Sequence, residues 1–227
     1  MESLIKSSFK AINSLFAPGM LFILFKSIVI TLLALTLFFF GASTLCFWLF
    51  GPESPIAWLG VFGAGMTAWF LFPSIMPVIV NFFDTRIVSL IESHEYPQAP
   101  KAQEPPFMRE LLHDMKFTAK ALMLNILALP FYLIPIVNLL LFYGLNGWLL
   151  GREFFVMVAR QHMTLDEAAA LHKRHSRMAG LGGTALAIMA TIPIVNLFAP
   201  IWGIALMVHL FHHLRAPEPQ ILPPYSS

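Results

Sequence analysis

The chain has 227 residues, of which 58% are apolar and only 11% are Asp, Glu, Lys or Arg. A soluble domain carries roughly 25% charged residues, so this composition excludes a soluble enzyme and indicates an integral membrane protein. The 14 basic residues exceed the 12 acidic ones by two, an excess too small for a nucleic-acid-binding surface. The single cysteine, Cys46, excludes an internal disulfide.

Lys6 and Lys10 precede the first apolar stretch, as in a secretion signal. That stretch is too long for a signal and no clear cleavage site follows it, so we expect none. Four runs lack any Asp, Glu, Lys or Arg and exceed the ~18 residues that mark a candidate membrane span. They cover residues 27–50, 54–83, 121–151 and 178–214.

The first two runs predict long transmembrane helices. Residues 27–50 would form a helix of ~36 Å, enough to cross a ~30 Å hydrocarbon layer. The segment 51–55, with two prolines and a glycine, predicts a tight turn, and residues 54–83 return. Small residues around Gly60 and Gly63 favour close packing of the two helices.

A connector and a surface helix are predicted next. Residues 93–106 contain four prolines among polar residues, which is typical of an extended aqueous connector. From Phe107 to Met115, apolar residues recur at helical spacing with charged residues between them. That pattern predicts a helix lying on the membrane surface.

The two remaining apolar runs contain the same hexapeptide, Ile-Pro-Ile-Val-Asn-Leu, at 134–139 and again at 192–197. A repeat of this kind indicates one supersecondary unit used twice. Pro135 and Pro193 lie near the middle of their runs, and a proline inside a helix costs about 3 kcal/mol or more. Asn138 and Asn196 then suit the start of a new helix. Each run is therefore predicted to fold into a hairpin, one within 107–151 and the other at 178–214.

The hairpin arms, about 15 residues each, would reach only ~22 Å, short of the ~30 Å layer. We therefore predict re-entrant hairpins whose tips are surrounded by protein; two pairs of short full spans are the alternative. Hairpins place all 14 basic residues on one face, as the positive-inside tendency favours. Single spans would put five on the opposite side, namely Arg152, Arg160, Lys173, Arg174 and Arg177.

Two shorter segments complete the predicted organisation. Thr164 and Glu167 have the spacing of a capping box, which predicts a helix from Leu165 to about Met178. The last residues, 216–227, contain four prolines and are predicted to be a disordered tail. Residues 1–215 would then form a single all-α membrane domain.

Several motifs, in this order and spacing, resemble the CysZ sulfate-permease family, which is grouped with the etoposide-induced membrane proteins. The matching residues are Pro18-Gly19-Met20, Leu133-Ile134-Pro135, Gly147-Trp148, Arg152-Glu153-Phe154-Phe155, and the hexapeptide at 192–197 with Pro200 beyond it. The resemblance covers roughly residues 5 to 213, and the segment 146–155 looks most like a divergent bacterial branch.

The resemblance implies two long transmembrane helices with two hemi-penetrating hairpins, a homo-oligomer in the bacterial inner membrane, and passage of sulfate into the cytoplasm for cysteine synthesis. In the family, arginines associated with sulfate follow the first motif, whereas this chain has Leu21 and Phe22. A non-transporting membrane scaffold of the same fold is the alternative function.

The candidate pathway residues are Asn138, Asn196, Arg152 and Arg160. Helices that start at the two asparagines would direct amide-rich ends into the membrane, an arrangement suited to anions. Arg152 lies at least 13 residues from Asn138, ~20 Å along a helix, so one chain does not complete a midplane site. Three explanations are open: the tips of several subunits combine, the arginines line the pathway entrance, or the asparagines only cap helices.

No catalytic residue, cofactor or metal site is expected. The chain has no nucleotide-binding loop, serine elbow or zinc-protease motif, which argues against an enzyme. His209, His212 and His213 have a spacing that suits a metal site, but no Cys or carboxylate lies nearby in the sequence, so water-facing histidines are the expectation. The predicted partners are the lipid bilayer and a small inorganic anion.

Overall fold

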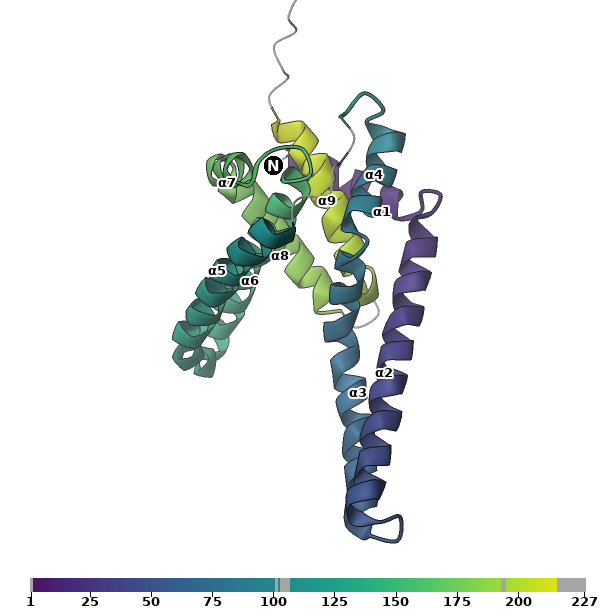
Figure 1. Cartoon of the computed structure of the whole chain (residues 1–227). Coiled ribbons are helices and arrows are strands. Elements are labelled where there is room, and N and C mark those ends of the chain that lie inside the picture. Colours follow the sequence, from purple (N-terminus) through teal and green to yellow (C-terminus); the bar gives the residue numbers. More distant parts are fainter. Residues whose placement is uncertain (1, 101, 103–106, 193–194, 216–227) are drawn as a thin grey trace, which may run out of the picture.

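The computed structural model describes residues 2–100, 102, 107–192 and 195–215, and these residues are mostly helical, with no strand among them (Figure 1). The predicted all-α class is confirmed. Pro193 and the predicted tail at 216–227 lie outside the described residues. The helices are α1 Glu2–Leu15, α2 Met20–Phe50, α3 Pro55–Asn81, α4 Asp84–Glu95, α5 Phe107–Ala128, α6 Pro135–Ala159, α7 Leu165–Arg174, α8 Ser176–Ala190 and α9 Ala199–Leu214, with 3-10 turns η1 Leu129–Leu133 and η2 Val195–Leu197.

Helices α2 and α3 form a long antiparallel hairpin. Met20–Phe50 and Pro55–Phe72 are long and apolar enough to cross a membrane, and a third span results if the pair Ser74–Asn81 and Asp84–Glu95, bent by 62°, counts as one. The first span begins at Met20, seven residues before the predicted position 27. Lys26 does not end the helix because its ammonium lies 5.2 Å from the Phe83 ring centroid, a favourable cation–π contact.

Close packing between α2 and α3 depends on Gly60. A Cβ at this position would lie 2.6 Å from Sγ of Cys46, so a larger residue would require the cysteine side chain to shift. The predicted role of small residues in the close approach of these two helices is therefore confirmed at Gly60. On the outside of the pair, Trp48 and Trp69 are largely exposed, which fits a surface facing lipid.

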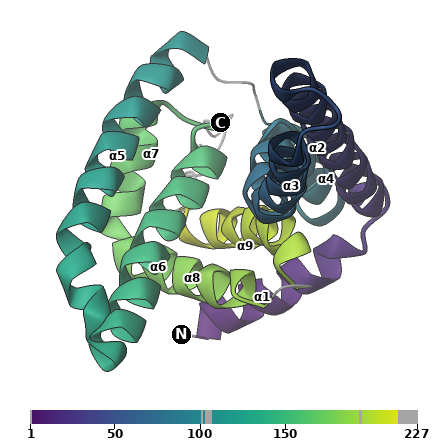
Figure 2. The ribbon, with the colours of Figure 1, turned by 90° about the horizontal axis from the view of Figure 1, so that it is seen from below.

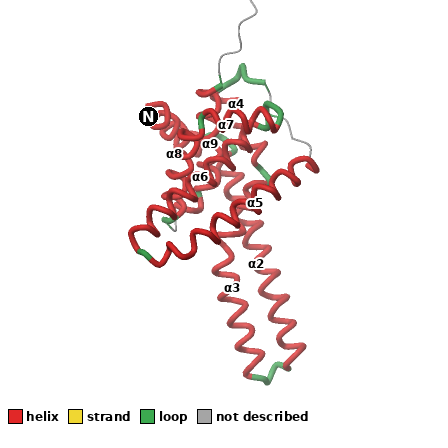
Figure 3. The backbone as a smooth tube through the Cα atoms, turned by 90° about the vertical axis from the view of Figure 1, so that its left-hand side faces the viewer, coloured by secondary structure: helices red, strands yellow, loops and turns green. Residues whose placement is uncertain are grey.

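Two shorter hairpins point the same way as α2 and α3 but end before the α2–α3 turn (Figures 1 and 3). The first comprises α5, η1 and α6, and the second comprises α8, η2 and α9. The arms α8 and α9 have 15 and 16 residues, as predicted for arms too short to span. The predicted hairpins are confirmed, while their depth in a bilayer remains a prediction.

The first hairpin is longer than expected. Helix α5 has 22 residues and α6 has 25, so the predicted separate surface helix is wrong and α6 continues past Arg152. The charges are accommodated on aromatic rings. The Lys120 ammonium lies 5.3 Å from the Trp148 ring centroid, and the Arg152 guanidinium lies 3.8 Å from that of Phe117. Because these contacts stabilise cations beside apolar surface, the helices need not end at them.

The two copies of the hexapeptide share one backbone hydrogen bond. The amide N–H of Asn138 donates to the Ile134 carbonyl, and that of Asn196 donates to the Ile192 carbonyl, both at 2.7 Å. However, α6 begins at Pro135 with Ile134 as its N-cap, and α9 begins at Ala199 with no side-chain cap. The prediction that the two asparagines cap these helices is therefore wrong.

The second tip differs because Pro200 follows it. Proline has no N–H to donate, so it is tolerated only in the first turn of a helix. The 3-10 turn at Val195–Leu197 therefore ends, and α9 begins as a separate helix with Pro200 in its first turn. Pro135, in contrast, takes the first position of α6, and the helix continues directly.

The predicted capping box at Thr164 is confirmed. The hydroxyl of Thr164 accepts from the Glu167 amide, and the Glu167 carboxylate accepts from the Thr164 amide at 2.8 Å. The resulting helix, α7, ends at Arg174 and not near Met178. A second helix, α8, starts at Ser176 in a new direction, and so the predicted single helix is divided at His175.

Helix α9 forms the centre of the fold. It is buried on all sides from Ala199 to Phe211, as expected for a helix that is apolar all round. Figure 2 shows it enclosed by α1, α8, α6 and the α3–α4 segment. The ends of α1, α4, α7 and α9 gather away from the α2–α3 turn (Figure 1).

Candidate functional site

A cavity of about 510 Å³ lies between the α3–α4 bend and the first hairpin. Helices α3 and α4 contribute polar side chains where they meet, α5 contributes mainly apolar ones, and α6 contributes one whole face. Its walls therefore combine lipid-like surface with amide and charged groups. The lining residues are Asn81, Asp84, Phe117, Thr118, Ala121, Asn146, Leu149, Leu150, Arg152, Glu153, Val156, Met157 and Arg160.

Arg152 and Arg160 both line this cavity. Each was predicted as a pathway residue; Arg152 lies within α6, and Arg160 is the C-cap residue of that helix. Asp84 and Glu153 line the same cavity, so the formal charges of the described lining residues sum to zero. The cavity therefore contains two guanidinium groups whose charges are balanced by two carboxylates.

Asn146 also lines the cavity, although it was not among the predicted site residues. Its side chain donates to the Phe142 carbonyl at 2.8 Å within α6, and not to another helix as an amide in an apolar run commonly does. A signal was present, because Asn146, Glu153 and Arg160 are spaced seven residues apart. That spacing places them on one helix face. Asn81 and Asp84 carry no comparable pattern.

Asn138 and Asn196 do not line the cavity. Both are half-buried and belong to the hairpin tips, far along the chain from the arginines. Leu21 and Phe22 are exposed at the start of α2. Two of the four predicted pathway residues therefore meet in one cavity, and the other two mark the tips.

The prediction that the α9 histidines face water is wrong for His209, which is 1% exposed. Ser14 donates its hydroxyl hydrogen to the Lys10 carbonyl at 3.0 Å. It must therefore accept the bond from His209 Nε2, also at 3.0 Å. Nδ1 is then an acceptor for the Tyr96 hydroxyl at 2.9 Å. These hydrogen bonds link α1, the end of α4 and α9 through the neutral imidazole of His209.

His212 is also largely enclosed, and its Nε2 lies 2.7 Å from a Glu92 oxygen. Glu92 is 120 positions away in sequence, which is why no carboxylate near the histidines was expected. His213 is exposed, so it alone of the three fits the predicted water-facing role.

His172 on α7 is buried beneath the charged run that follows it. Burial lowers the pKa of His172 to about 4, and the positive charge of Arg152 lowers it as well. Its ring centroid lies 6.0 Å from that of Phe155 on α6. The next residues, Lys173 and Arg174, are exposed, so the histidine is covered while its charged neighbours are accessible.

Comparison with known proteins places these features in a family. A protein-family model described as sulfate transporter CysZ/Etoposide-induced protein 2.4 matches residues 7–200. The match includes α2, α3, both sides of the cavity and the first hairpin. Comparison with curated proteins finds no match.

Proposed function

This chain belongs to the CysZ/etoposide-induced protein 2.4 family, and we propose that it is a permease or channel for sulfate in the bacterial inner membrane, supplying sulfate assimilation. The family supports a transporter of this general kind and not an enzyme. The observation that carries the proposal is the meeting of Arg152 and Arg160 in one cavity. Guanidinium groups bind tetrahedral oxyanions through paired N–H donors.

The charge balance of the cavity suits passage better than retention. An anion entering it interacts with Arg152 and Arg160 but also faces the carboxylates of Asp84 and Glu153. Conduction requires binding strong enough to admit the ion and weak enough to release it. A neutral cavity with two guanidinium groups meets this requirement, whereas two unopposed arginines would hold a dianion tightly.

The cavity would be one end of the pathway, and the hairpin tips would lie further along it. Each helix start supplies an effective charge of about +0.5, so α6 and α9 together offset roughly half of a sulfate dianion. The amides of Asn138 and Asn196 would add polar contacts at the tips. Because one chain then leaves the pathway incomplete, we propose a homo-oligomer in which tips from several subunits combine.

Sulfate flux into liposomes tests the proposal. Purified full-length protein is reconstituted, radiolabelled sulfate is added outside, and uptake is compared with empty liposomes and with liposomes containing the double variant Arg152→Gln/Arg160→Gln. Uptake by the native protein alone is expected. Uptake equal to that of empty liposomes, with the reconstituted protein shown to be folded, would sink the proposal for sulfate.

A non-transporting membrane scaffold is the alternative function. It is favoured by Leu21 and Phe22, which are exposed where the family has arginines. In that case the hairpins would serve assembly alone. The two proposals differ in the liposome assay, because a scaffold gives no flux of any anion, whereas a permease with another substrate admits phosphate, thiosulfate or chloride.

A further inference from the structure

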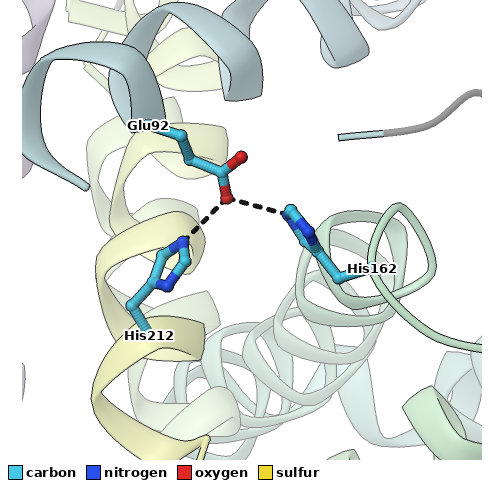
Figure 4. A group of neighbouring side chains, drawn as sticks. All are labelled: Glu92, His162 and His212. Atoms are coloured by element: carbon cyan, nitrogen blue, oxygen red, sulfur yellow. Dashed lines mark hydrogen bonds and ion pairs between the residues drawn. The ribbon is translucent and has the colours of Figure 1, made fainter. Parts of the chain in front are cut away.

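Three side chains from three separate segments meet in one cluster (Figure 4). Glu92 belongs to α4, His162 follows the end of α6, and His212 lies in the last turn of α9. Oε1 of Glu92 lies 2.7 Å from Nε2 of His212 and 2.8 Å from Nε2 of His162. One donor atom from each residue falls within 4.8 Å of the others.

This cluster is withdrawn from water. The exposed fractions of the side chains are 6% for Glu92, 0% for His162 and 11% for His212. Among the described residues, the ion-pair partners of Glu92 are these two imidazoles. Removing a carboxylate from water without a compensating positive charge is costly. The carboxylate therefore needs a positive charge beside it, which a protonated imidazole or a bound metal cation supplies.

Several polar atoms of the cluster have no hydrogen-bond partner. Oε2 of Glu92 is buried without a hydrogen-bond partner, and so are both ring nitrogens of His162. The Nε2 atom of His162 lies 2.8 Å from Oε1 of Glu92, so a nitrogen and an oxygen that can each ligate a metal lie side by side. A buried polar group without a partner requires an explanation, and a missing ion is one of those expected.

Aromatic rings fix both imidazoles. Tyr96 stacks on His212 with ring centroids 4.0 Å apart and an angle of 17° between the planes. Phe211 stacks on His162 at 5.2 Å with the same angle. The stacking holds the two imidazole planes, and both Nε2 atoms lie beside the same carboxylate oxygen (Figure 4). Such outer contacts orient ligands in metal sites.

We propose that Glu92, His162 and His212 bind one divalent transition-metal cation, with Zn²⁺ as the ion that this donor set suits. Two imidazole nitrogens and one carboxylate oxygen are a common zinc ligand set, completed by a water or a second carboxylate oxygen. Zinc–ligand distances of ~2.0–2.2 Å separate tetrahedral donors by ~3.4 Å. The donors, now 2.7 and 2.8 Å apart, must therefore open by about 0.6–0.7 Å, which rotation of the Glu92 side chain supplies.

The bound ion would act as a clamp. It would join α4, the α6–α7 connection and α9, three segments that are remote in sequence. None of the three ligands lines the cavity that contains Arg152 and Arg160. The metal site therefore does not rest on the proposed transport function, and either proposal can fail without the other.

Zinc binding to the full-length protein tests the site. The protein is purified with an affinity tag that contains no histidine, stripped with a chelator, and titrated with Zn²⁺ by calorimetry. One equivalent per chain is expected, together with a rise in the melting temperature. Glu92→Gln and His212→Gln should each weaken Zn²⁺ binding more than about 100-fold. Mutating a residue that only hydrogen-bonds to a metal ligand already lowers metal affinity about 10–100-fold.

His213→Gln is the matched control, because His213 is exposed beside His212 and does not belong to the cluster. It should bind Zn²⁺ as the native chain does. Stoichiometric binding that survives in folded Glu92→Gln and His212→Gln variants would place the ion elsewhere and overturn the proposal.

Should those variants fail to fold, X-ray absorption on the zinc-loaded native protein decides the case. Two imidazole ligands and at least one carboxylate oxygen are expected in the coordination shell. Fewer than two imidazoles, or no binding of Zn²⁺ by the folded native protein, contradicts the proposal.

Discussion

Gly151 on α6 and Gly183 on α8 touch backbone to backbone. A Cβ added at Gly183 would lie 2.6 Å from the Cα of Gly151, and one added at Gly151 would lie 2.7 Å from the carbonyl carbon of Ala179. Helix α6 packs extensively on α8 through this contact. The two glycines therefore hold the first hairpin against the second, and Arg152 owes its position beside the cavity to the same crossing.

Gly183→Ala should destabilise the protein by at least about 1–3 kcal/mol, the usual cost of overpacking a close contact. The neighbouring atoms are backbone and cannot move aside as a flexible side chain would. Gly180→Ala is the control on the same helix, because a Cβ there meets nothing within 4 Å; it should be neutral or stabilise by up to about 1 kcal/mol. Melting temperatures in detergent measure both, and equal effects would refute the contact.

Arg152→Gln and Arg160→Gln should each lower sulfate uptake at least about 10-fold, because a charge-assisted hydrogen bond contributes ~1.5–3 kcal/mol. The control is Arg174→Gln, since Arg174 is exposed on α7 and does not line the cavity. Initial uptake rates in liposomes measure the effect. If all three variants transport alike, the two cavity arginines have no part in the pathway.

Asn138→Leu and Asn196→Leu examine the hairpin tips separately. Leucine shares the branching of asparagine at Cγ but has no polar side-chain atom, so each change should reduce uptake if the anion passes the tips. Uptake rates and oligomer size by light scattering are measured together. Unchanged uptake in both variants would remove the tips from the pathway and leave the cavity arginines as its only proposed contacts.

The hairpins could be predicted because each depends on local chemistry. Pro135 stands mid-run in the sequence, and the turn it forms needs no distant partner. The arm lengths of the first hairpin could not be predicted in the same way. Lys120 and Arg152 were treated as helix ends, whereas Trp148 and Phe117 from the opposite arm stabilise them. Those contacts exist only after the hairpin has closed.

The cavity and the metal cluster differ in how visible they are in sequence. Asn146, Glu153 and Arg160 are spaced seven residues apart, so part of the wall that α6 and its C-cap contribute could have been predicted. Glu92 and His212 are 120 positions apart and meet only through the packing of α4 on α9. No spacing rule predicts such a contact, because it depends on the tertiary fold.

The stability of the protein should fall as the pH decreases from about 6.5 to 4, through His172. In the unfolded chain this imidazole binds its proton near its ordinary pKa of 6.5, whereas burial and Arg152 lower the folded-state pKa to about 4. The unfolded state therefore takes up the proton first, and acid weakens the fold by up to about 3 kcal/mol over this range. Below pH 4 the contribution stays constant.

His172→Leu should flatten that part of the pH profile, since leucine has no proton to bind. His213→Gln is the control because His213 is exposed and should leave the slope intact. Melting temperatures at intervals between pH 4 and pH 8 measure the three proteins. An unchanged slope in His172→Leu would assign the acid sensitivity to another group.

Cysteine labelling distinguishes re-entrant hairpins from paired full spans, which the basic residues alone do not separate. In a chain with Cys46→Ala, single cysteines replace Glu53 in the α2–α3 turn, Arg174 on α7 and Leu133 at the first hairpin tip. Glu53 and Arg174 are exposed, and Leu133 is 87% exposed to the surroundings of the protein. Gly151 is unsuitable because any side chain there collides with α8.

A membrane-impermeant maleimide added to intact cells should label Glu53→Cys and leave Arg174→Cys unlabelled until the cells are opened. Leu133→Cys should resist labelling from both sides, because a thiol in the hydrocarbon layer does not form the reactive thiolate. Only denaturation should expose it. If Leu133→Cys reacts from outside as readily as Glu53→Cys, the first hairpin crosses the whole membrane and its arms are two full spans.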